Sequence, residues 1–529
     1  MSYDTIVVGA GSAGCVIAAR LSEDPARRVL LLEAGGADSS IFIRMPAGVA
    51  KAIASKKYNW HYQTDPQAHM NGRRVYWPRG RVLGGSSSIN AMVMVRGHPS
   101  DYDAWRDAGC PGWGYDDVLP YFRKMETNAR GPNAWRGGDG PMHLADPEVS
   151  SPIFGAFIEA GREAGYPVCD DFNGAGCEGF GPFQLNIKDG VRWSAARAYL
   201  DPLHERRNLT VRTDAFVTGL AFDGTRCTGV RVAGGGDART IEATEVILCG
   251  GSINTPQLLM LSGVGPADHL RSHGIAVVAD RPGVGANLQD HLEVKVKYRA
   301  LLPVTMWKHA KFPNYLWTGL QYLAMRRGAG RGQGLEAGAF IRLQPGANTP
   351  DTQLHFINAL AFDGATAADR GHGFAIDTTQ LRPESRGTIR LRSADPAVHP
   401  AIDPNYLATE TDRRMMRDGL KLLREICAQP ALSPYVGEEL RPGPSITTDM
   451  QLDALVRQTA DSIYHPVGSC RMGTDDGAVV DPVSMRVHGT TGLRVADASI
   501  MPSLVAGNTN GPAIMIGERA AALIAATSG

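Results

Sequence analysis

Apolar runs alternate with glycine-rich turns at the start of the chain. Residues 5–8, Thr-Ile-Val-Val, form the continuous apolar run expected of a strand that is buried on both faces of a parallel sheet. The segment 9–14, Gly-Ala-Gly-Ser-Ala-Gly, separates this run from a helical stretch at 15–21. A second apolar run at 28–32 ends in Glu33. This order predicts a strand, a tight turn, a helix and a second strand.

Four later segments carry clear periodicity. Residues 209–212, Leu-Thr-Val-Arg, predict another strand, and the alternation at 388–392 predicts a half-exposed antiparallel strand. Residues 410–427 have the apolar spacing of a surface helix. The segment 513–526 predicts a terminal helix, with Pro512 well placed at its first turn.

Length and charge exclude several classes of protein. A chain of 529 residues exceeds one simple core, so two domains are expected. Lys+Arg and Asp+Glu both number 54, and this balance argues against a nucleic-acid partner. Residues 498–517 carry no charge, but Pro502 and Pro512 make a continuous membrane helix implausible there, and we expect no integral membrane segment.

The cysteines indicate a reducing compartment. The eight cysteines are scattered, and no Cys-x-x-Cys pair occurs. This pattern is typical of reduced, buried thiols and gives no metal site. The segment before the first strand lacks a basic region and a cleavage site, so we predict a cytoplasmic protein.

The glycine turn has the spacing of a dinucleotide-binding fingerprint. Gly9 permits the tight turn, Gly11 lets a pyrophosphate approach the backbone, and Gly14 allows the helix to pack on the strand. The free N–H groups at the start of the helix favour phosphate binding. Glu33 follows Gly14 by 19 residues, where a carboxylate can accept hydrogen bonds from ribose hydroxyls. The segment predicts FAD or NAD rather than NADP.

Five further segments carry a family resemblance. They are Arg-Val-Leu-Gly-Gly-Ser-Ser-Ser-Ile-Asn-Ala at 81–91, Gly-Ser-Ile-Asn-Thr-Pro-Gln at 251–257, Gly-Val-Gly-Ala-Asn-Leu-Gln-Asp-His at 283–291, Tyr-His-Pro at 464–466 and Gly-Leu-Arg-Val-Ala-Asp-Ala-Ser at 492–499. In this order they resemble the signatures of the glucose–methanol–choline (GMC) family of FAD-dependent oxidoreductases. Within the family, the chain is most similar to the choline-dehydrogenase-like bacterial branch.

The resemblance implies a non-covalent FAD. Some family members attach FAD through a histidine where this chain has Ile89, which has no nucleophile. By similarity, Val217 contacts the adenine through its backbone, and Asp497 and Ala498 approach the ribityl chain or the phosphate. Asn510 is either a flavin contact or a cap of the last helix. The residues expected to bind the cofactor are Gly9, Gly11, Ser12, Ala13, Gly14, Glu33, Ala34, Arg81, Leu83, Gly85, Asn90, Ala91, Val217, Asp497, Ala498 and Asn510.

The motif positions also predict the domain organisation. The fold class is α/β, with a discontinuous Rossmann-like FAD-binding domain and an α+β substrate domain that contains an antiparallel sheet. The segments 1–149, 191–300 and 456–529 form the first domain. The segments 150–190 and 301–455, which are rich in aromatic residues, form a lid over the flavin.

His465 and Asn508 are the predicted catalytic pair. Oxidation of an alcohol removes a hydride from carbon and a proton from oxygen, and a base must take that proton. The ordinary pKa of histidine suits this task, and an amide N–H can stabilise the developing alkoxide. The resemblance supports both residues, because the family pairs a histidine with a second histidine or an asparagine.

The predicted function is oxidation of a primary alcohol to an aldehyde by hydride transfer to FAD. The alternative is a flavin-containing cyanohydrin (hydroxynitrile) lyase of the same fold. The identity of the alcohol, the electron acceptor (oxygen, or a quinone or other acceptor) and the oligomeric state are left open. We expect His291, which closes the loop at 283–291, to have a structural role, and His355 to have either a packing or a substrate role.

Overall fold

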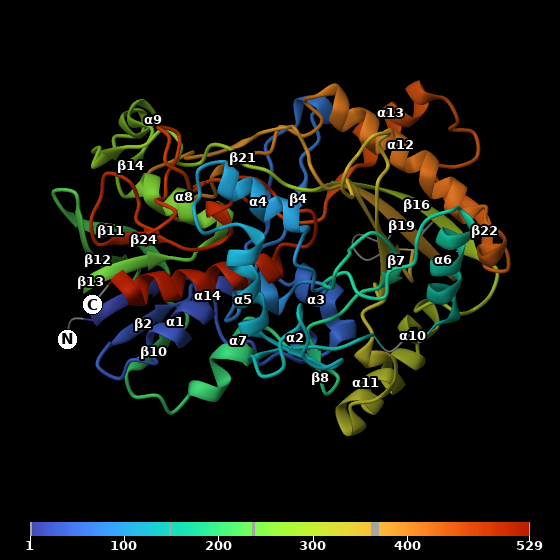
Figure 1. Ribbon diagram of the computed structural model, residues 1–529, viewed down its shortest axis with the longest axis horizontal. Coiled ribbons are helices and arrows are strands. Elements are labelled where there is room, and N and C mark those ends of the chain that lie inside the picture. The colour runs from blue at the N-terminus through green and yellow to red at the C-terminus, as the bar shows by residue number, and fades with distance from the viewer. Residues whose placement is uncertain (1–2, 148–150, 235–238, 361–369, 528–529) are drawn as a thin grey trace.

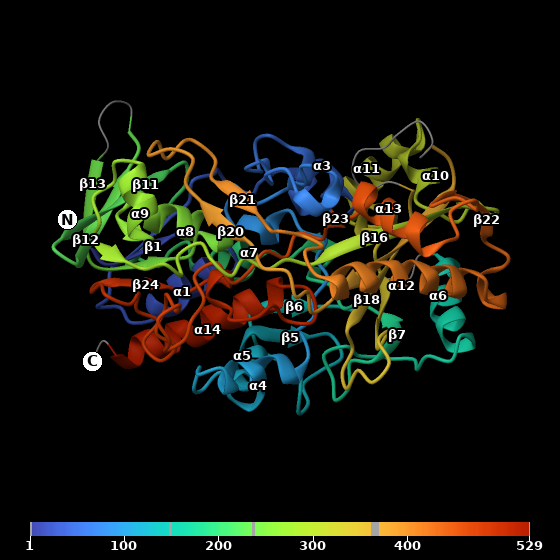
Figure 2. The same cartoon turned by 90° about the horizontal axis from the view of Figure 1, so that it is seen from above.

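The computed structural model describes residues 3–147, 151–234, 239–360 and 370–527. Two seven-stranded sheets lie toward opposite ends of an elongated molecule (Figures 1 and 2). The N-terminal strand and the C-terminal helix both lie at the end that holds the first sheet.

The first sheet has a parallel part. Its strands are β1 (Tyr3–Val8), β2 (Val29–Leu32), β10 (Leu209–Arg212), β11 (Val217–Asp223), β12 (Arg226–Val232), β13 (Arg239–Leu248) and β24 (Leu493–Val495). The order is β10-β2-β1-β13-β12-β11, with β24 also paired to β13. The contacts that join β10, β2, β1, β13 and β24 are parallel, whereas β11 and β12 are antiparallel. The predicted Rossmann-like α/β class is confirmed.

Two helices from opposite ends of the chain pack together beside this sheet. Helix α1 (Ser12–Leu21) follows β1, and α14 (Asn510–Thr527) is the last helix. They run side by side in Figures 1 and 2. Arg20 donates to both carboxylate oxygens of the fully buried Glu518, at 2.8 and 2.9 Å. This contact joins segments that are 498 residues apart in the chain.

The second sheet is antiparallel. Its strands are β7 (Gly179–Pro182), β16 (Leu292–Ala300), β17 (Ala337–Ile341), β18 (Thr352–Ile357), β19 (Gly373–Gln380), β22 (Val436–Arg441) and β23 (Asp461–Ser462). The order is β22-β16-β19-β18-β17-β7, and β23 also pairs with β16. Strand β16 comes from a segment that the sequence placed with the cofactor-binding domain, yet its hydrogen-bonded neighbours are β19, β22 and β23.

The predicted surface helix lies against the second sheet. Helix α12 (Glu410–Cys427) has the predicted bounds, and its side chains Met416, Leu420 and Leu423 are buried. Gly419 lets it approach closely, because a Cβ there would lie 2.4 Å from Oγ1 of Thr378 on β19. The helix therefore covers one face of this sheet.

The strand expected at 388–392 covers only residues 388–390 and is not part of the seven-stranded antiparallel sheet. Strand β20 (Thr388–Arg390) pairs with β21 (Ala401–Asp403) in a separate two-stranded sheet. The other helices are α2 (Ile41–Arg44), α3 (Val49–Ala54), α4 (Pro99–Asp107), α5 (Tyr115–Met125), α6 (Pro152–Glu163), α7 (Ala195–Tyr199), α8 (Gly251–Leu261), α9 (Ala267–Ser272), α10 (Trp307–Ala310), α11 (Asn314–Met325) and α13 (Asp449–Thr459). Among the described residues, no helix is both long enough and apolar enough to cross a membrane.

Candidate active site

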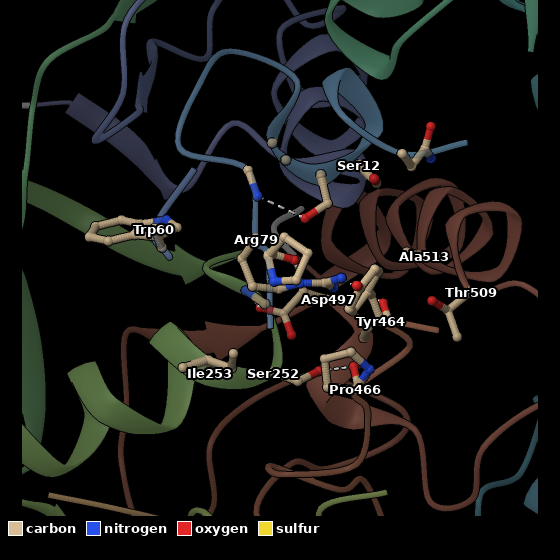
Figure 3. Close-up of a pocket in the computed structure, with 18 of the residues that line it drawn as sticks. Ser12, Trp60, Arg79, Ser252, Ile253, Tyr464, Pro466, Asp497, Thr509 and Ala513 are labelled. Atoms are coloured by element: carbon tan, nitrogen blue, oxygen red, sulfur yellow. Dashed lines mark hydrogen bonds between the residues drawn. The ribbon is translucent and has the colours of Figure 1, made fainter. Parts of the chain in front are cut away.

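A cavity of about 340 Å³ is lined by residues of both sheets. It runs along the turn after β1 and the carboxyl ends of neighbouring parallel strands, where α/β sheets bind ligands. On the other side it meets Lys295, His355 and Asp377 of the second sheet. Figure 3 shows Trp60 on one side of this pocket, with Thr509 and Ala513 on the opposite side.

Most of the predicted site residues line this cavity. They are Gly9, Gly11, Ser12, Ala13, Glu33, Ala34, Gly85, Asn90, Ala91, Val217, His465, Asp497, Ala498, Asn508 and Asn510. Gly14, Arg81 and Leu83 do not line it. Arg81 is exposed, with its guanidinium over the ring of Trp60, and the Leu83 N–H donates to the Gly36 carbonyl at 2.9 Å. The structure therefore does not place these two residues at the cavity.

The three glycines of the first turn have different surroundings. A Cβ on Gly14 would lie 1.9 Å from the carbonyl oxygen of Gly9, and Gly9 itself has a φ of +100°. Both residues are therefore required by the packing of the protein chain. A Cβ on Gly11 would meet only the Cys249 carbonyl oxygen, at 4.0 Å. The protein itself does not require glycine at position 11, so the space that this residue leaves belongs to the cavity.

Glu33 is held by the backbone of the same turn. Its two carboxylate oxygens accept hydrogen bonds from the N–H groups of Ala10 and Gly35, at 3.0 and 2.9 Å. Burial raises the pKa of Glu33 to about 7, and these hydrogen bonds oppose the shift. Further hydrogen-bond donors on a ligand would favour the ionised carboxylate.

The C-terminal segment reaches the same turn through polar contacts. Ser12 donates a hydrogen bond to Oδ1 of Asn510 at 2.8 Å, which joins the start of α1 to the start of α14. Asp497 accepts from the Gly251 N–H at 2.8 Å and from the Thr255 hydroxyl at 2.7 Å. The Asp497 carboxylate thus holds the first turn of α8 (Gly251–Leu261) as well as lining the cavity.

A strained turn presents His465 to the cavity. Tyr464 has a φ of +69°, in the left-handed region that non-glycine residues rarely adopt. Its carbonyl accepts from Arg79 at 2.6 Å, and its N–H donates to Ser462 at 2.8 Å. The N–H of His465 donates to the buried carboxylate of Asp290 at 2.7 Å. These contacts hold Tyr464 in its unfavourable backbone conformation, next to His465.

A directional chain of hydrogen bonds determines the tautomer of His465. The carbonyl of Leu381 can only accept, so Nε2 of His291, 3.1 Å away, carries a proton. Burial lowers the pKa of His291 to about 3, so this ring is neutral and its Nδ1 is an acceptor. Nδ1 of His465 lies 3.0 Å from it and must donate. The unprotonated nitrogen of His465 is therefore Nε2, which accepts a hydrogen bond from Nδ2 of Asn508 at 3.3 Å.

Gln353 extends this chain at its other end. Its Nε2 donates to Oδ1 of Asn508 at 3.1 Å from strand β18, where the side chain is fully buried. With Oδ1 occupied, Nδ2 of Asn508 faces Nε2 of His465. A base and an amide donor therefore converge on one place in the cavity.

The environment keeps His465 uncharged. Burial lowers its pKa well below the ordinary histidine value, and the nearby His291, His355 and Arg79 add to the shift. A neutral imidazole with an unprotonated Nε2 can accept a proton at neutral pH.

Several residues that line or contact the cavity were not predicted from the sequence. Arg79 precedes the loop at 81–91 and could have been found from its position. Gln353, Lys295 and Asp377 are polar residues within strands, and only the cross-strand pairing places them at the cavity. His291, expected to be structural, is in direct contact with His465.

The chain belongs to the GMC oxidoreductase family, whose two regions match residues 3–293 and 383–517. It is therefore an FAD-dependent oxidoreductase of the group that acts on alcohols.

Similar proteins with curated names cover nearly the whole chain. The mitochondrial choline dehydrogenase of Homo sapiens is 48% identical over 99% of this chain and 89% of that protein. The oxygen-dependent choline dehydrogenase of Rhizobium etli is 46% identical over 98% of this chain and 95% of that protein.

Solved structures show the same fold. Pyridoxine 4-oxidase from Mesorbium loti superposes with a TM-score of 0.89 and 35% identity, covering 98% of this chain and 99% of that chain. A formate oxidase variant from Aspergillus oryzae superposes with a TM-score of 0.93 and 28% identity, covering 99% of this chain and 98% of that chain.

Proposed function

We propose that this enzyme oxidises a primary alcohol to an aldehyde, with His465 as the base and Asn508 as the hydrogen-bond donor to the alkoxide. The observation that carries the proposal is that the unprotonated Nε2 of His465 and Nδ2 of Asn508 lie 3.3 Å apart at the cavity. A hydroxyl oxygen held there can give its proton to one group and accept a hydrogen bond from the other.

The residues around the first turn fit FAD. The open space at Gly11 suits the close approach of a pyrophosphate, and α1 begins at the next residue with unpaired N–H groups. Glu33 lies where it can accept from ribose hydroxyls, and Val217 lies further along the same cavity. When bound, FAD supplies the two-electron acceptor for the hydride of the alcohol. We propose that it is held without a covalent bond, because the cavity residue Ile89 has no nucleophilic atom.

The proton has a defined destination. Nε2 of His465 takes the hydroxyl proton, and the ring then carries a positive charge beside the neutral His291. Asn508 donates to the oxygen as its negative charge develops, and this contact is stronger in the transition state than in the ground state. His465 is buried, and the lower local dielectric strengthens both interactions.

We also propose that the two domains follow the two sheets, with the boundary before β16 rather than at residue 300, because β16 pairs within the second sheet. All eight cysteines are unpaired, which suits a reducing compartment such as the cytoplasm. The electron acceptor after the alcohol step is oxygen or a carrier such as a quinone.

The relatives and solved structures described above have dehydrogenase and oxidase names, and we do not propose the lyase alternative. A hydroxynitrile lyase would need only deprotonation of its substrate. Anaerobic reduction of the flavin by an alcohol would distinguish the two activities.

Replacement of His465 tests the proposed base. In His465→Ala the hydroxyl proton has no acceptor, so anaerobic flavin reduction by a reactive alcohol should slow by about 10² to 10⁴-fold. Stopped-flow absorption of the flavin measures this rate. The matched control is His204→Ala, because this histidine side chain is 75% exposed. Near-normal reduction by His465→Ala with full flavin content would disprove the assignment.

A further inference from the structure

Four ionisable side chains form one polar patch on the cavity face of the second sheet. Lys295, Asp377 and His355 are directly opposite one another on β16, β19 and β18. Directly paired residues point to the same face of a sheet, and Glu293 shares that face because it precedes Lys295 by two residues. All four line the cavity. We call Glu293, Lys295, His355 and Asp377 the tetrad.

The tetrad lies next to the proposed reacting groups. Gln353, which holds Asn508, precedes His355 by two residues on β18, so their side chains share a face about 7 Å apart along the strand. A short substrate whose hydroxyl lies between His465 and Asn508 can therefore place its other end against the tetrad.

The acidic and basic side chains of the tetrad pair with each other. Lys295 lies 2.5 Å from Glu293, and Nδ1 of His355 lies 2.8 Å from Oδ1 of Asp377. Burial raises the pKa of Glu293 well above its ordinary value, and the nearby Lys295 opposes this shift. Burial opposes ionisation of Asp377 too, but His355 and Lys295 outweigh it and lower the pKa of this carboxyl. Each acidic side chain of the tetrad therefore already has a basic partner within it.

Lys295 is the tetrad member most open to the cavity. Its side chain is 30% exposed, whereas those of Glu293, His355 and Asp377 are between 2% and 7% exposed. An arriving group therefore meets an ammonium that can donate hydrogen bonds, with the carboxylates behind it already paired.

This arrangement is poorly suited to a quaternary ammonium group. Such a group makes no ordinary hydrogen bonds, and proteins recognise it through a cage of aromatic faces. Among the described residues, the Phe, Tyr and Trp side chains that line the cavity are Trp60, Phe216 and Tyr464. Trp60 and Phe216 pack on each other with ring centroids 5.9 Å apart, and Trp60 lies across the pocket from Thr509 (Figure 3). Of these three aromatic residues, only Tyr464 is next to His465 in the chain.

We propose that the tetrad binds the far end of the substrate and selects an uncharged alcohol that carries a second oxygen, as a hydroxyl or an ether, over a quaternary ammonium alcohol. The proposal rests on the function proposed above. An oxygen accepts a hydrogen bond from Lys295 without disturbing its pairing with Glu293. A cation would be repelled by Lys295, and an anion by Asp377.

Two matched pairs of alcohols test the proposal with the FAD-loaded enzyme. Choline is compared with its uncharged isostere 3,3-dimethylbutan-1-ol, and 1,4-butanediol with 1-pentanol, by anaerobic flavin reduction. We expect the isostere to exceed choline, and the diol to exceed pentanol, each by about tenfold in second-order rate. A rate for choline that is tenfold above that of its isostere would overturn the proposal.

The variant Lys295→Met tests the residue itself. It removes the ammonium and keeps the length of the side chain, so the diol-over-pentanol preference should fall by about tenfold and the choline-to-isostere ratio should rise by a similar factor. Lys56→Met, at an exposed lysine, should change neither ratio. Unchanged ratios in Lys295→Met with full flavin content would assign the selectivity elsewhere and overturn the role of the tetrad.

Equilibrium binding separates this proposal from the proposed function. Tetramethylammonium and 1,2-dimethoxyethane contain no oxidisable hydroxyl, so their Kd values, read from changes in the flavin spectrum, are independent of turnover. We expect tighter binding of the ether in the wild type and a loss of that preference in Lys295→Met. Tighter binding of tetramethylammonium overturns the tetrad proposal even if no alcohol reduces the flavin, whereas the absence of reduction contradicts only the proposed function.

Discussion

At the scale of single residues, the reactivity proposed for His465 depends on hydrogen bonds that all point one way. Each donor along the chain from Gln353 to Leu381 faces an acceptor that cannot reverse its role without leaving another group unpaired. The direction is set at one end by a backbone carbonyl, which has no proton to give. A change at the far end should therefore affect the reacting groups.

The variant Gln353→Glu should reverse the amide of Asn508. An ionised carboxylate cannot donate to Oδ1, so the amide should turn and present its oxygen to His465, slowing flavin reduction by about 100-fold. Lowering the pH should protonate the new carboxyl and restore part of the rate. Gln353→Leu is the control, because it lacks this titration. A rate within twofold of wild type at pH 8 in Gln353→Glu would contradict the positioning role.

The low pKa of His465 predicts a particular pH dependence. The uncharged ring is the active form, and burial lowers its pKa below 6.5, with contributions from His291, His355 and Arg79. Flavin reduction should therefore remain constant from pH 8 down to 6.5 and decline only at lower pH. Stopped-flow rates across this range provide the check, and an acid limb centred at or above pH 6.5 would contradict the assignment.

At the scale of elements, the turn between β1 and α1 combines two requirements. Gly9 and Gly14 allow the strand and the helix to pack, whereas Gly11 leaves space toward the cavity. The helix also contacts α14, so its position is set from both ends of the chain. The sequence spacing predicted a separate role for each of these glycines, and the packing adds that a Cβ is excluded at Gly9 and Gly14 but not at Gly11.

A pair of alanine substitutions separates these roles. Gly11→Ala should leave the melting temperature of the FAD-free protein nearly unchanged and weaken FAD binding by about tenfold or more. Gly14→Ala should destabilise the FAD-free protein by about 1–3 kcal/mol, because its Cβ would overlap the Gly9 carbonyl. Thermal denaturation and FAD titration measure the two effects. Equal destabilisation by both variants would contradict the distinction.

At the scale of the whole molecule, the site is formed where the two sheets meet. The first sheet provides Gly11 and Glu33, the second provides Gln353 and the tetrad, and the C-terminal segments supply His465 and Asn508. Residues from both ends and from the middle of the chain thus share one cavity. Binding of FAD to the folded protein should stabilise these contacts together.

Non-covalent attachment of the cofactor follows from the same arrangement. Ile89 lines the cavity and packs among apolar residues. Its side chain has no nucleophile that could form a bond to FAD. Acid or heat denaturation should therefore release all of the FAD, which filtration and the absorption of the filtrate would measure. Flavin retained on the denatured chain would contradict this prediction.

Several elements of this protein could be predicted from its sequence alone. A buried parallel strand, a glycine turn and an N-terminal helix depend on neighbouring residues, so periodicity and spacing predicted them, and α12 has its predicted bounds. The position of strand β20 was not predicted, because alternation indicates a strand but not its partner. The tautomer of His465 and the tetrad were decided only by tertiary structure. Both depend on groups far apart in the chain that β-pairing and burial bring together, and no local pattern encodes that proximity.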